Sequence, residues 1–443
     1  MNFMPKRDSH PARVVFADAF AGCGGLSLGL MQAGLAGSFA VERDKFAFST
    51  LAANLLSNEG RFKFDWPDWL PQRAISINSL LTHHREQLCA LSGAIDVLVG
   101  GPPCQGFSYA GRRLYSDPRN KLFGAYLDLV SILKPHVVLL ENVRGFTASF
   151  AKSRRQDSYS EKVRLALSSD YVVHEELLDL AKFGVPQART RYFLIASRAG
   201  LFSENPFDLL RARLPSFLRT LGLVVPVSSW SAISDLEISR GGIQVSCDTP
   251  GFNEIRYVEP VTRFQKLLSN GVTAPTDLRL ARHSKKIASR FSKIIEASQA
   301  EGRLNTSISD ELRARFSLKK RALRVLDPDR PSPTVTSMPD DLLHYSEART
   351  LTVRENARLQ SFPDWFAFRG KYTTGGHLRR REVPRFTQVA NAVPPLVARA
   401  IGEMLMSAFS NINANMQTAL SISRCKSVSQ VSKLRSQIEQ HSP

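Results

Sequence analysis

The chain has 443 residues, enough for two or three domains, and 43% of them are hydrophobic, enough to fill a sizeable core. A formal net charge of +19 favours a polyanionic partner, nucleic acid first, over a merely soluble basic protein. The five cysteines are widely spaced and form no Cys-x-x-Cys pair, which argues against a disulfide framework or structural zinc site. No apolar leader and no run of about 18 apolar residues stands out, so we expect a soluble, intracellular protein that contacts no membrane.

The first 200 residues alternate between apolar runs and helical patterns. Strands are predicted at 14–20, 38–42, 94–101, 136–143, 171–180 and 190–197, with helices at 26–34, 47–56 and 121–135. This alternation predicts an α/β fold with a doubly wound, Rossmann-like parallel sheet and helices on both faces. Ligands of such sheets bind at the carboxyl ends of the strands, where Gly22 to Gly25, Glu42, Cys104 and Glu141 all fall.

The pattern changes at about Leu201 and stays irregular to about Arg324, with Pro, Ser, Arg and Lys in excess. Residues 282–297 still have helical spacing, with Ile287, Phe291 and Ile294 on one side. A second helix is expected after Thr352, which forms a capping-box pattern with Glu355. A final helix should begin at the Pro394–Pro395 pair, and the Ser/Gln/Lys-rich end is expected to be poorly ordered.

The glycine turn Gly22-x-Gly24-Gly25 follows the first strand, and Glu42 ends the second. The spacing is neither the dinucleotide Gly-x-Gly-x-x-Gly nor a phosphate-binding loop. A carboxylate at that place suits ribose hydroxyls, so a nucleoside cofactor without a pyrophosphate fits best, and S-adenosylmethionine is one. Taken alone, the turn is explained equally well as a plain tight connection between a strand and a helix.

The stretch VLVGGPPCQGFSYAG places Cys104 directly after a rigid Pro-Pro pair at the end of a predicted strand. A buried structural cysteine is the commonest fate of this residue type. However, Pro102 and Pro103 continue a strand poorly, and an exposed thiol in a rigid turn at the ligand edge favours a nucleophile.

Several motifs together resemble the DNA cytosine-5 methyltransferases of bacterial restriction-modification systems. They are DAFAGCGGLSLG, GGPPCQGFS, DPRNKLF, ENV, FGVPQARTRYFLIA, LTVRENARLQSFPD and QVANAVPP. They occur in family order from Asp18 to about Met406. The resemblance implies a methyltransferase-type sheet domain at 1–200, a target-recognition region at 201–326, a small-domain segment with a basic loop at 327–383, a completing helix at 384–410 and a tail at 411–443.

The resemblance also assigns roles to individual residues. The catalytic set is Cys104 as the nucleophile on cytosine C6, Glu141, Arg189 and Arg191. The positions matching S-adenosylmethionine binding are Phe20, Gly22, Gly24, Gly25, Leu26, Glu42, Arg43, Ser76, Ile77, Pro102, Leu122, Asn391 and Val393. The expected DNA contacts are Gln105, Ser108, Arg379, Arg380 and Arg381, and no metal is expected. Ser76 stands where the family often has an acid, Arg43 where it often has an aromatic or aliphatic residue, and Ala390 where it often has a glycine.

The resemblance implies a monomer that acts on double-stranded DNA near the nucleoid, with a restriction endonuclease as a functional partner. One alternative is a tRNA cytosine-5 methyltransferase of the same fold, although its Cys-Phe-Thr tripeptide does not occur in the variable region. Another is a catalytically silent DNA-binding regulator, which should have lost Cys104, Glu141 or the glycine turn. All three are present.

Overall fold

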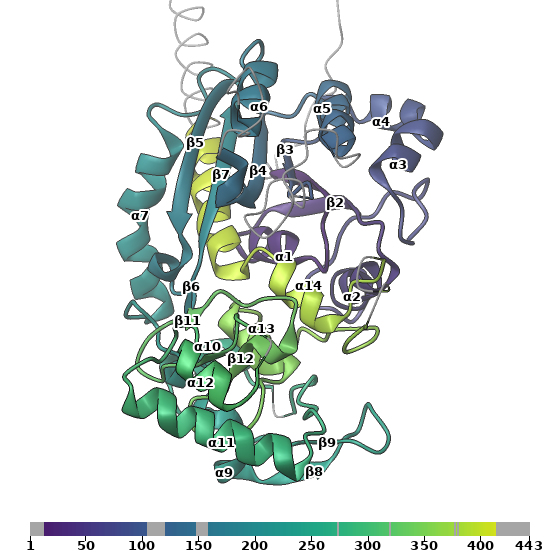
Figure 1. The fold of residues 1–443 in the computed structure, drawn as a ribbon. Helices are drawn as coiled ribbons and strands as arrows, with labels where there is room; N and C mark the ends of the chain where they lie inside the picture. Colours follow the sequence, from purple (N-terminus) through teal and green to yellow (C-terminus); the bar gives the residue numbers. More distant parts are fainter. Residues whose placement is uncertain are drawn as a thin grey trace, which may run out of the picture.

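The computed structural model describes residues 13–103, 120–147, 158–272, 274–318, 320–375, 378 and 381–412 (Figure 1). Among the predicted site residues, Cys104, Gln105, Ser108, Arg379 and Arg380 lie outside the described residues, as does almost all of the predicted tail.

The largest element is a six-stranded sheet with the order β2-β1-β3-β4-β7-β5. In chain order its strands are β1 (Val15–Ala19), β2 (Ala36–Val41), β3 (Val97–Gly100), β4 (Val137–Val143), β5 (Val172–Asp179) and β7 (Thr190–Ser197). The strands β1 to β4 pair in parallel, as predicted.

The expectation of an all-parallel sheet is wrong for β7, which runs antiparallel to both β4 and β5. Only residues 180–189 connect β5 to β7, and they hold the short turn η2 (Leu180–Phe183) and the strand β6 (Gln187–Ala188). A parallel crossover needs roughly a dozen residues or more, so this short connection returns the chain antiparallel.

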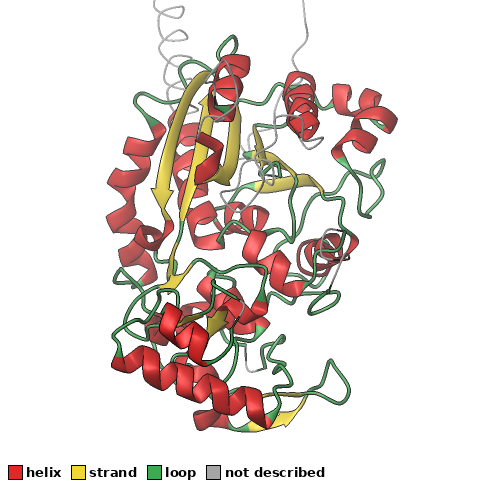
Figure 2. Cartoon of the chain, in the orientation of Figure 1, coloured by secondary structure: helices red, strands yellow, loops and turns green. Residues whose placement is uncertain are grey.

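Helices cover both faces of the sheet, as predicted (Figure 2). One face, with Phe16, Val99 and Ile195, packs on α1 (Gly25–Gln32), α2 (Lys45–Leu55), α7 (Pro206–Leu221) and a helix at 395–412. The other face packs on α3 (Ile77–His83), α4 (Arg85–Ala90), α5 (Asn120–Leu133) and α6 (Tyr159–Leu167). Because α7 contributes Phe207 and Leu210 to the first face, the sheet domain's core continues past residue 200.

Below the sheet in Figure 1 lies a smaller, irregular region. It contains α8 (Ser229–Ile233), η3 (Ser234–Leu236), α9 (Ile238–Gly241), β8 (Ile243–Val245), β9 (Asn253–Ile255), α10 (Arg263–Ser269), α11 (Lys285–Ala300), α12 (Asp310–Arg315), β10 (Arg324–Val325), β11 (Ser332–Pro333), η4 (Pro339–Asp341), β12 (Leu342–Leu343) and α13 (Val353–Leu359). The predicted helix near residue 290 is α11, and Phe291 and Ile294 are buried. The capping box predicted at Thr352 and Glu355 is present at the start of α13.

The chain then returns to the sheet domain through α14 (Arg385–Asn391) and the helix at 395–412, which begins at the predicted Pro-Pro pair. By length and composition, Arg385–Ile412 is apolar enough to cross a membrane, but 67% of its most apolar window is buried inside the molecule. Val397, Ile401 and Leu405 belong to the same core as α1. Packing within the fold therefore accounts for its apolar character.

Candidate active site

The predicted glycine turn joins β1 to α1 with a backbone that favours glycine. Gly22 has a φ of 58° and Gly24 a φ of 93°, and Gly24 is the left-handed N-cap of α1. Phe20 also has a positive φ, 64°, and its ring centroid lies 6.4 Å from that of Tyr126 on α5. Leu122, another predicted cofactor position on α5, packs against the same core cluster as Phe20.

Glu42 follows β2 and is fixed by two backbone N–H groups. Gly22 N donates to its Oε2 at 2.9 Å, and Asp44 N donates to its Oε1 at 2.7 Å. Burial raises the pKa of this carboxyl, and the two amide donors oppose the rise. Its backbone oxygen accepts from Ile75 N at 2.8 Å, so the segment with predicted cofactor positions Ser76 and Ile77 lies beside it.

Ser76 itself caps α3, because its hydroxyl accepts from Ser79 N at 3.1 Å, and Ile77 is buried at the first position of that helix. Arg43, predicted at the same edge, is exposed. The structure thus brings the Ser76 segment to the edge of the turn, with its hydroxyl engaged in the helix cap.

The glycine turn contacts the segment that follows α14, more than 360 residues further along the chain. A Cβ on Gly25 would lie 2.5 Å from the carbonyl oxygen of Val393, so only glycine fits this approach. Leu26 is buried next to it, Val393 is buried, and Asn391 is exposed at the last position of α14. The predicted cofactor positions from both ends of the chain are therefore neighbours.

The predicted catalytic acid and one arginine form an ion pair where β4 ends and β7 begins. Arg191 Nε lies 3.2 Å from Glu141 Oε1, and the two side chains are only 15% and 12% exposed. The antiparallel register explains the contact, because Arg191 on β7 pairs with Val143, two residues from Glu141 on β4. Burial raises the pKa of Glu141, while Arg191 and Arg189 oppose the rise.

The chain that leads to Cys104 is anchored beside this pair. Asn142 Nδ2 donates to the carbonyl oxygen of Pro102 at 3.1 Å, and Asn142 Oδ1 accepts from Val143 N at 2.9 Å. A Cβ on Gly101 would lie 3.4 Å from Glu141 Oε2. Gly101 therefore lies next to the Glu141 carboxyl, and Pro102, two residues before Cys104, is held by Asn142.

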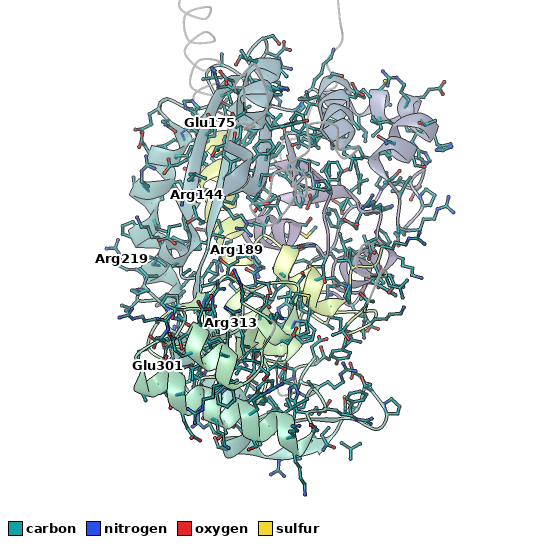
Figure 3. The ribbon with its side chains drawn as sticks, in the orientation of Figure 1. Arg144, Glu175, Arg189, Arg219, Glu301 and Arg313 are labelled. Carbon is teal, nitrogen blue, oxygen red and sulfur yellow. The ribbon has the colours of Figure 1, made fainter. Side chains whose placement is uncertain are left out.

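Arg189, the other arginine of the predicted catalytic set, also contacts α14. It is buried where the sheet meets the smaller region, and its Nη1 donates to the carbonyl oxygen of Ala390 at 2.9 Å (Figure 3). It thereby links β7 to α14, just before Asn391.

Two buried glutamines that sequence analysis did not single out reinforce this link. Gln187 donates to Gln360 Oε1 at 2.9 Å and accepts from Val335 N at 3.0 Å, while Gln360 donates to Val389 O at 2.7 Å. Both residues belong to motifs that the sequence analysis recognised, FGVPQARTRYFLIA and LTVRENARLQSFPD. A polar side chain within such a mainly apolar stretch was the signal that could have identified them. They join the sheet domain, α13 and α14.

Asp18 was also overlooked, although it stands near the carboxyl end of β1. Its side chain is 1% exposed, its Oδ2 accepts from Ser27 Oγ at 2.5 Å, and its Oδ1 has no hydrogen-bond partner within the described part of the chain. Desolvation raises its pKa to about 7, with Ser27 opposing and Glu42 adding to the rise. A carboxylate at the ligand end of a buried strand was the signal for it.

Of the predicted arginine triplet, Arg381 is described. It is exposed, and its backbone N–H donates to Leu378 O at 2.9 Å. In the described ranges, no group of three or more His, Cys, Asp or Glu side chains has an arrangement that could hold a metal ion.

Comparisons with known proteins identify the family of this chain. The family model for C-5 cytosine-specific DNA methylase matches residues 14–407. Type II methyltransferase M.DdeI of Desulfomicrobium norvegicum is 31% identical over 420 residues, covering 92% of each chain. Type II methyltransferase M1.HphI of Haemophilus parahaemolyticus is 29% identical, covering 92% of this chain and 91% of that one.

Among solved structures, a candidate DNA modification methyltransferase encoded within an E. coli prophage superposes with a TM-score of 0.63 at 25% identity. The match covers 89% of this chain and 99% of that one. The family match spans nearly the whole described structure, from β1 to the helix at 395–412. The chain belongs to the C-5 cytosine-specific DNA methylase family, as its motifs predicted.

Proposed function

We propose that this DNA cytosine-5 methyltransferase takes its methyl group from S-adenosylmethionine and delivers it to C5 of a cytosine flipped out of a specific duplex sequence. In this proposal, a covalent Cys104 adduct is the intermediate. The observation that carries it is the buried Glu141–Arg191 pair, 3.2 Å apart, beside the Pro102 segment that leads to Cys104. An acid beside the segment that leads to a cysteine suits attack of a thiol on a pyrimidine ring.

The residues at the glycine turn fit the proposed cofactor. The positive-φ turn lets a ligand approach the backbone closely, and Glu42 holds a fixed carboxylate at the end of β2, suited to ribose hydroxyls. Phe20 offers a ring face, and Asp18 Oδ1 lacks a partner among the described side chains. S-adenosylmethionine, when bound, supplies an electrophilic methyl-sulfonium group.

Cys104 would act as a thiolate whose sulfur bonds to C6 of cytosine, which breaks the C5=C6 π bond and makes C5 nucleophilic. Glu141 would donate a proton to N3 as the thiolate adds, a role that needs a carboxyl protonated near neutral pH, and burial raises its pKa in that direction. Arg191 would hold Glu141 in place and contact O2. After methylation, a base such as water would take the C5 proton, its electron pair would re-form the C5=C6 double bond as the thiolate leaves C6, and N3 would return its proton to Glu141.

We assign binding of the duplex to Gln105, Ser108 and the triplet Arg379, Arg380 and Arg381, and choice of target to region 201–326. The names of the relatives, type II methyltransferases, support a restriction endonuclease as the functional partner. The enzyme would act as a monomer in the cytoplasm, at the nucleoid. Bisulfite sequencing of DNA from cells that express the chain would report the target sequence.

The covalent step is tested with duplex DNA that carries 5-fluorocytosine at the mapped target. That base has no C5 proton to lose, so the adduct should persist and shift the wild-type protein in a denaturing gel when S-adenosylmethionine is present. Cys104→Ala should give no shift and no methylation. Glu141→Gln should slow both steps by about two to four orders of magnitude, the usual worth of acid assistance.

Cys89 offers a matched control, because it is an exposed cysteine on α4. Cys89→Ala should form the adduct at the wild-type rate. Methylation of C5 by Cys104→Ala would overturn the covalent mechanism.

A further inference from the structure

At the outer edge of the smaller region, where Figure 1 shows β8 and β9, these two strands form a two-stranded antiparallel sheet. The two strands pair through Gln244 and Glu254, and a third segment joins them by a bridge between Glu254 and Arg279. Leu280 N donates to Asn253 O at 2.9 Å on one side of that bridge. The backbone at Arg279 is therefore held against β9 by this bridge, next to the loop that links β8 to β9.

Guanidinium groups and aromatic rings alternate beside this sheet. The guanidinium carbon of Arg279 lies 4.3 Å from the ring centroid of Phe252 and 3.6 Å from that of Tyr372. Arg282 lies 4.2 Å from the Phe252 ring, and Arg385 lies 4.1 Å from the Tyr372 ring. All are within cation–π range. We call Phe252, Arg279, Arg282, Tyr372 and Arg385 the arginine–aromatic stack.

The stack carries more positive charge than its acidic neighbours neutralise. Arg385 Nη1 pairs with Asp248 at 2.7 Å and with Asp277 at 2.8 Å. Within the described chain, neither Arg279 nor Arg282 forms an ion pair, and Arg279 Nε is buried without a hydrogen-bond partner. Arg282 donates to the carbonyl oxygen of Gly251. In the described part of the chain, two of the three guanidinium groups thus have no ion-pair partner.

The aromatic rings also fix how these groups can bind. A ring covers a face of each guanidinium, so the hydrogen-bonding edge is the part left for a ligand. A planar guanidinium held this way matches two acceptors side by side, which phosphate oxygens and the O6/N7 edge of guanine both offer. Tyr372 and Arg385 also belong to the segment that carries Arg381, a residue we expect to contact DNA.

We propose that the arginine–aromatic stack is a DNA-binding site, in which Arg279 and Arg282 present their guanidinium edges to paired acceptors of the duplex. This inference rests on the proposed function and adds named residues to the recognition region. The ligand in either case is a pair of hydrogen-bond acceptors on DNA. These acceptors belong either to the edge of a guanine base or to a backbone phosphate.

The test measures binding of the full chain to two fluorescent duplexes over a range of salt concentrations. One duplex carries the target mapped by bisulfite sequencing, and the other is a scrambled sequence of equal length and composition. Arg282→Ala is the decisive variant, since Arg282 is exposed and its loss should not unfold the protein. We expect it to weaken binding to the target by about tenfold, within the range for one bidentate base contact.

The two acceptor sources give different results. A guanine contact predicts that Arg282→Ala weakens binding to the target duplex but not to the scrambled one. A phosphate contact predicts equal weakening of both, with a salt slope reduced by up to about one unit. Phe252→Leu keeps both arginine charges but removes the ring that orients them, so it should weaken binding in the same pattern.

The control is Arg219→Ala, which removes one exposed arginine from α7, at the opposite edge of the molecule in Figure 3. It should bind both duplexes like the wild type. Wild-type binding of both duplexes by Arg282→Ala and Phe252→Leu would overturn the inference. Failure of the proposed function differs from this, because the wild-type protein itself would then leave cytosine C5 unmethylated.

Discussion

The sheet domain and the region around α13 share an apolar cluster but differ in how many charged side chains they bury. On both faces of the sheet, the buried clusters consist of apolar side chains such as Phe16, Val99 and Leu194. Around α13, the largest fully buried side chains are two arginines, Arg354 and Arg358. The core of the sheet domain is therefore mainly apolar, whereas buried arginines stand at the centre of the region around α13.

Each buried arginine near α13 has partners from several segments. Arg358 donates to Asp364 at 2.9 and 2.7 Å and also pairs with Asp235 of η3. Arg354 donates to Phe366 O at 2.7 Å and to Thr276 O at 2.9 Å. These contacts tie residues 235 and 276, both in the predicted recognition region, to α13.

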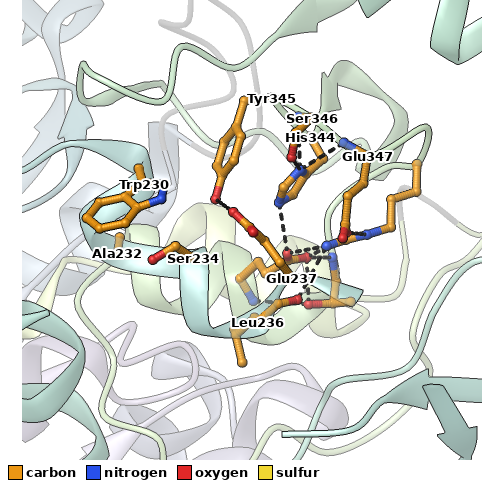
Figure 4. A network of polar contacts seen from close by, with 12 residues as sticks. Trp230, Ala232, Ser234, Leu236, Glu237, His344, Tyr345, Ser346 and Glu347 are labelled. Atoms are coloured by element: carbon orange, nitrogen blue, oxygen red, sulfur yellow. Dashed lines mark hydrogen bonds and ion pairs between the residues drawn. The ribbon is translucent and has the colours of Figure 1, made fainter. Parts of the chain in front are cut away.

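A third arginine completes the arrangement. Arg349 donates to both oxygens of Glu355 at 2.9 and 2.8 Å and to the backbone oxygen of Leu236. Nearby, Tyr345 donates to Glu237 Oε1 at 2.5 Å (Figure 4). Residues 236–237, inside the predicted recognition region, are thus joined to residues 345–355, which follow it, by charged and polar groups.

The difference follows from how much regular structure each part contains. A sheet sets the positions of its strands through backbone hydrogen bonds, so its side chains need only be apolar and complementary in shape. The segments around α13 have few strands, and directional contacts must orient them instead. Buried ion pairs have a large desolvation cost, and we infer that they are retained here because they fix orientation.

Replacement of Arg358 by methionine is the strongest way to break this arrangement. The change would leave Asp235 and Asp364 buried without their partner, and loss of one member of a buried pair typically costs about 3–5 kcal/mol. We expect Arg358→Met to lower the free energy of unfolding by that amount, measured by urea denaturation.

Arg211 provides the control, because it pairs with Glu176 and Asp208 on the surface. Exposed pairs contribute about 0–1 kcal/mol, so Arg211→Met should change stability little. Equal losses in the two variants would contradict the contrast between buried and exposed pairs.

The sequence was most informative about the sheet domain. Apolar runs and glycine turns predicted its six strands, the helices α1, α2 and α5 and the edge where Glu42 and Glu141 lie, because these patterns reflect local geometry. The helices α3, α4, α6 and α7 were not predicted. The direction of β7 was missed, since it depends on the length of the connection from β5 rather than on β7 itself. The resemblance to a family, rather than periodicity, suggested Arg191 as the partner of Glu141.

The region around α13 was far less predictable. Its capping box at Thr352 is a local signal and was found, whereas the pairing of Arg358 with Asp235 joins residues 123 positions apart. Charged residues on a helix usually face solvent, so Arg354 and Arg358 gave no sign of burial. The arginine–aromatic stack was missed for the same reason, because Arg279, Phe252 and Tyr372 meet only after folding.

Two buried acids sharpen the comparison through the pH dependence of stability. Asp18 in the sheet domain has no arginine partner among the described ion pairs, and burial raises its pKa to about 7. Glu355 beside α13 is also buried, but Arg349 lowers its pKa below the usual value despite the cost of desolvation. The two groups should therefore affect stability in opposite directions as pH changes.

For Asp18, the folded state holds its proton more tightly than the unfolded state between about pH 4 and pH 7, so its contribution to stability falls as pH rises through that window. The wild type should lose up to about 4 kcal/mol relative to Asp18→Asn from pH 4 to pH 8, because one pKa unit is worth about 1.4 kcal/mol. Melting temperatures of the two proteins over this range provide the measurement. A difference that does not vary with pH would show that Asp18 keeps an ordinary pKa.

For Glu355, the folded state holds the proton less tightly, so its contribution is complete above the unfolded pKa and is lost as pH falls through the folded one. The stability advantage of the wild type over Glu355→Gln should be constant from pH 6 to pH 8 and shrink in acid, below the ordinary value of 4.5. The same melting series checks this. An advantage that grows as pH falls would contradict the ion pair with Arg349.

The smallest expected effect concerns close packing in the sheet domain, where glycines let helices approach. A Cβ on Gly29 of α1 would lie 2.4 Å from both Ala398 Cβ and Pro395 O, at the start of the helix at 395–412. Alanine stabilises a helix relative to glycine by about 1 kcal/mol. Overpacking typically costs about 1–3 kcal/mol, and the backbone oxygen of Pro395 would have to move to make room for the new Cβ. Gly29→Ala should therefore destabilise the protein by about 1–2 kcal/mol in urea denaturation.

Gly124 of α5 is the matched control, since a Cβ there would meet no described atom within 4 Å. Gly124→Ala should stabilise the protein by about 0.5–1 kcal/mol, because only the helix preference remains. If Gly29→Ala were as stable as Gly124→Ala, the helix at 395–412 would not pack closely against α1. Apolar packing would then not be what holds this helix to the sheet domain.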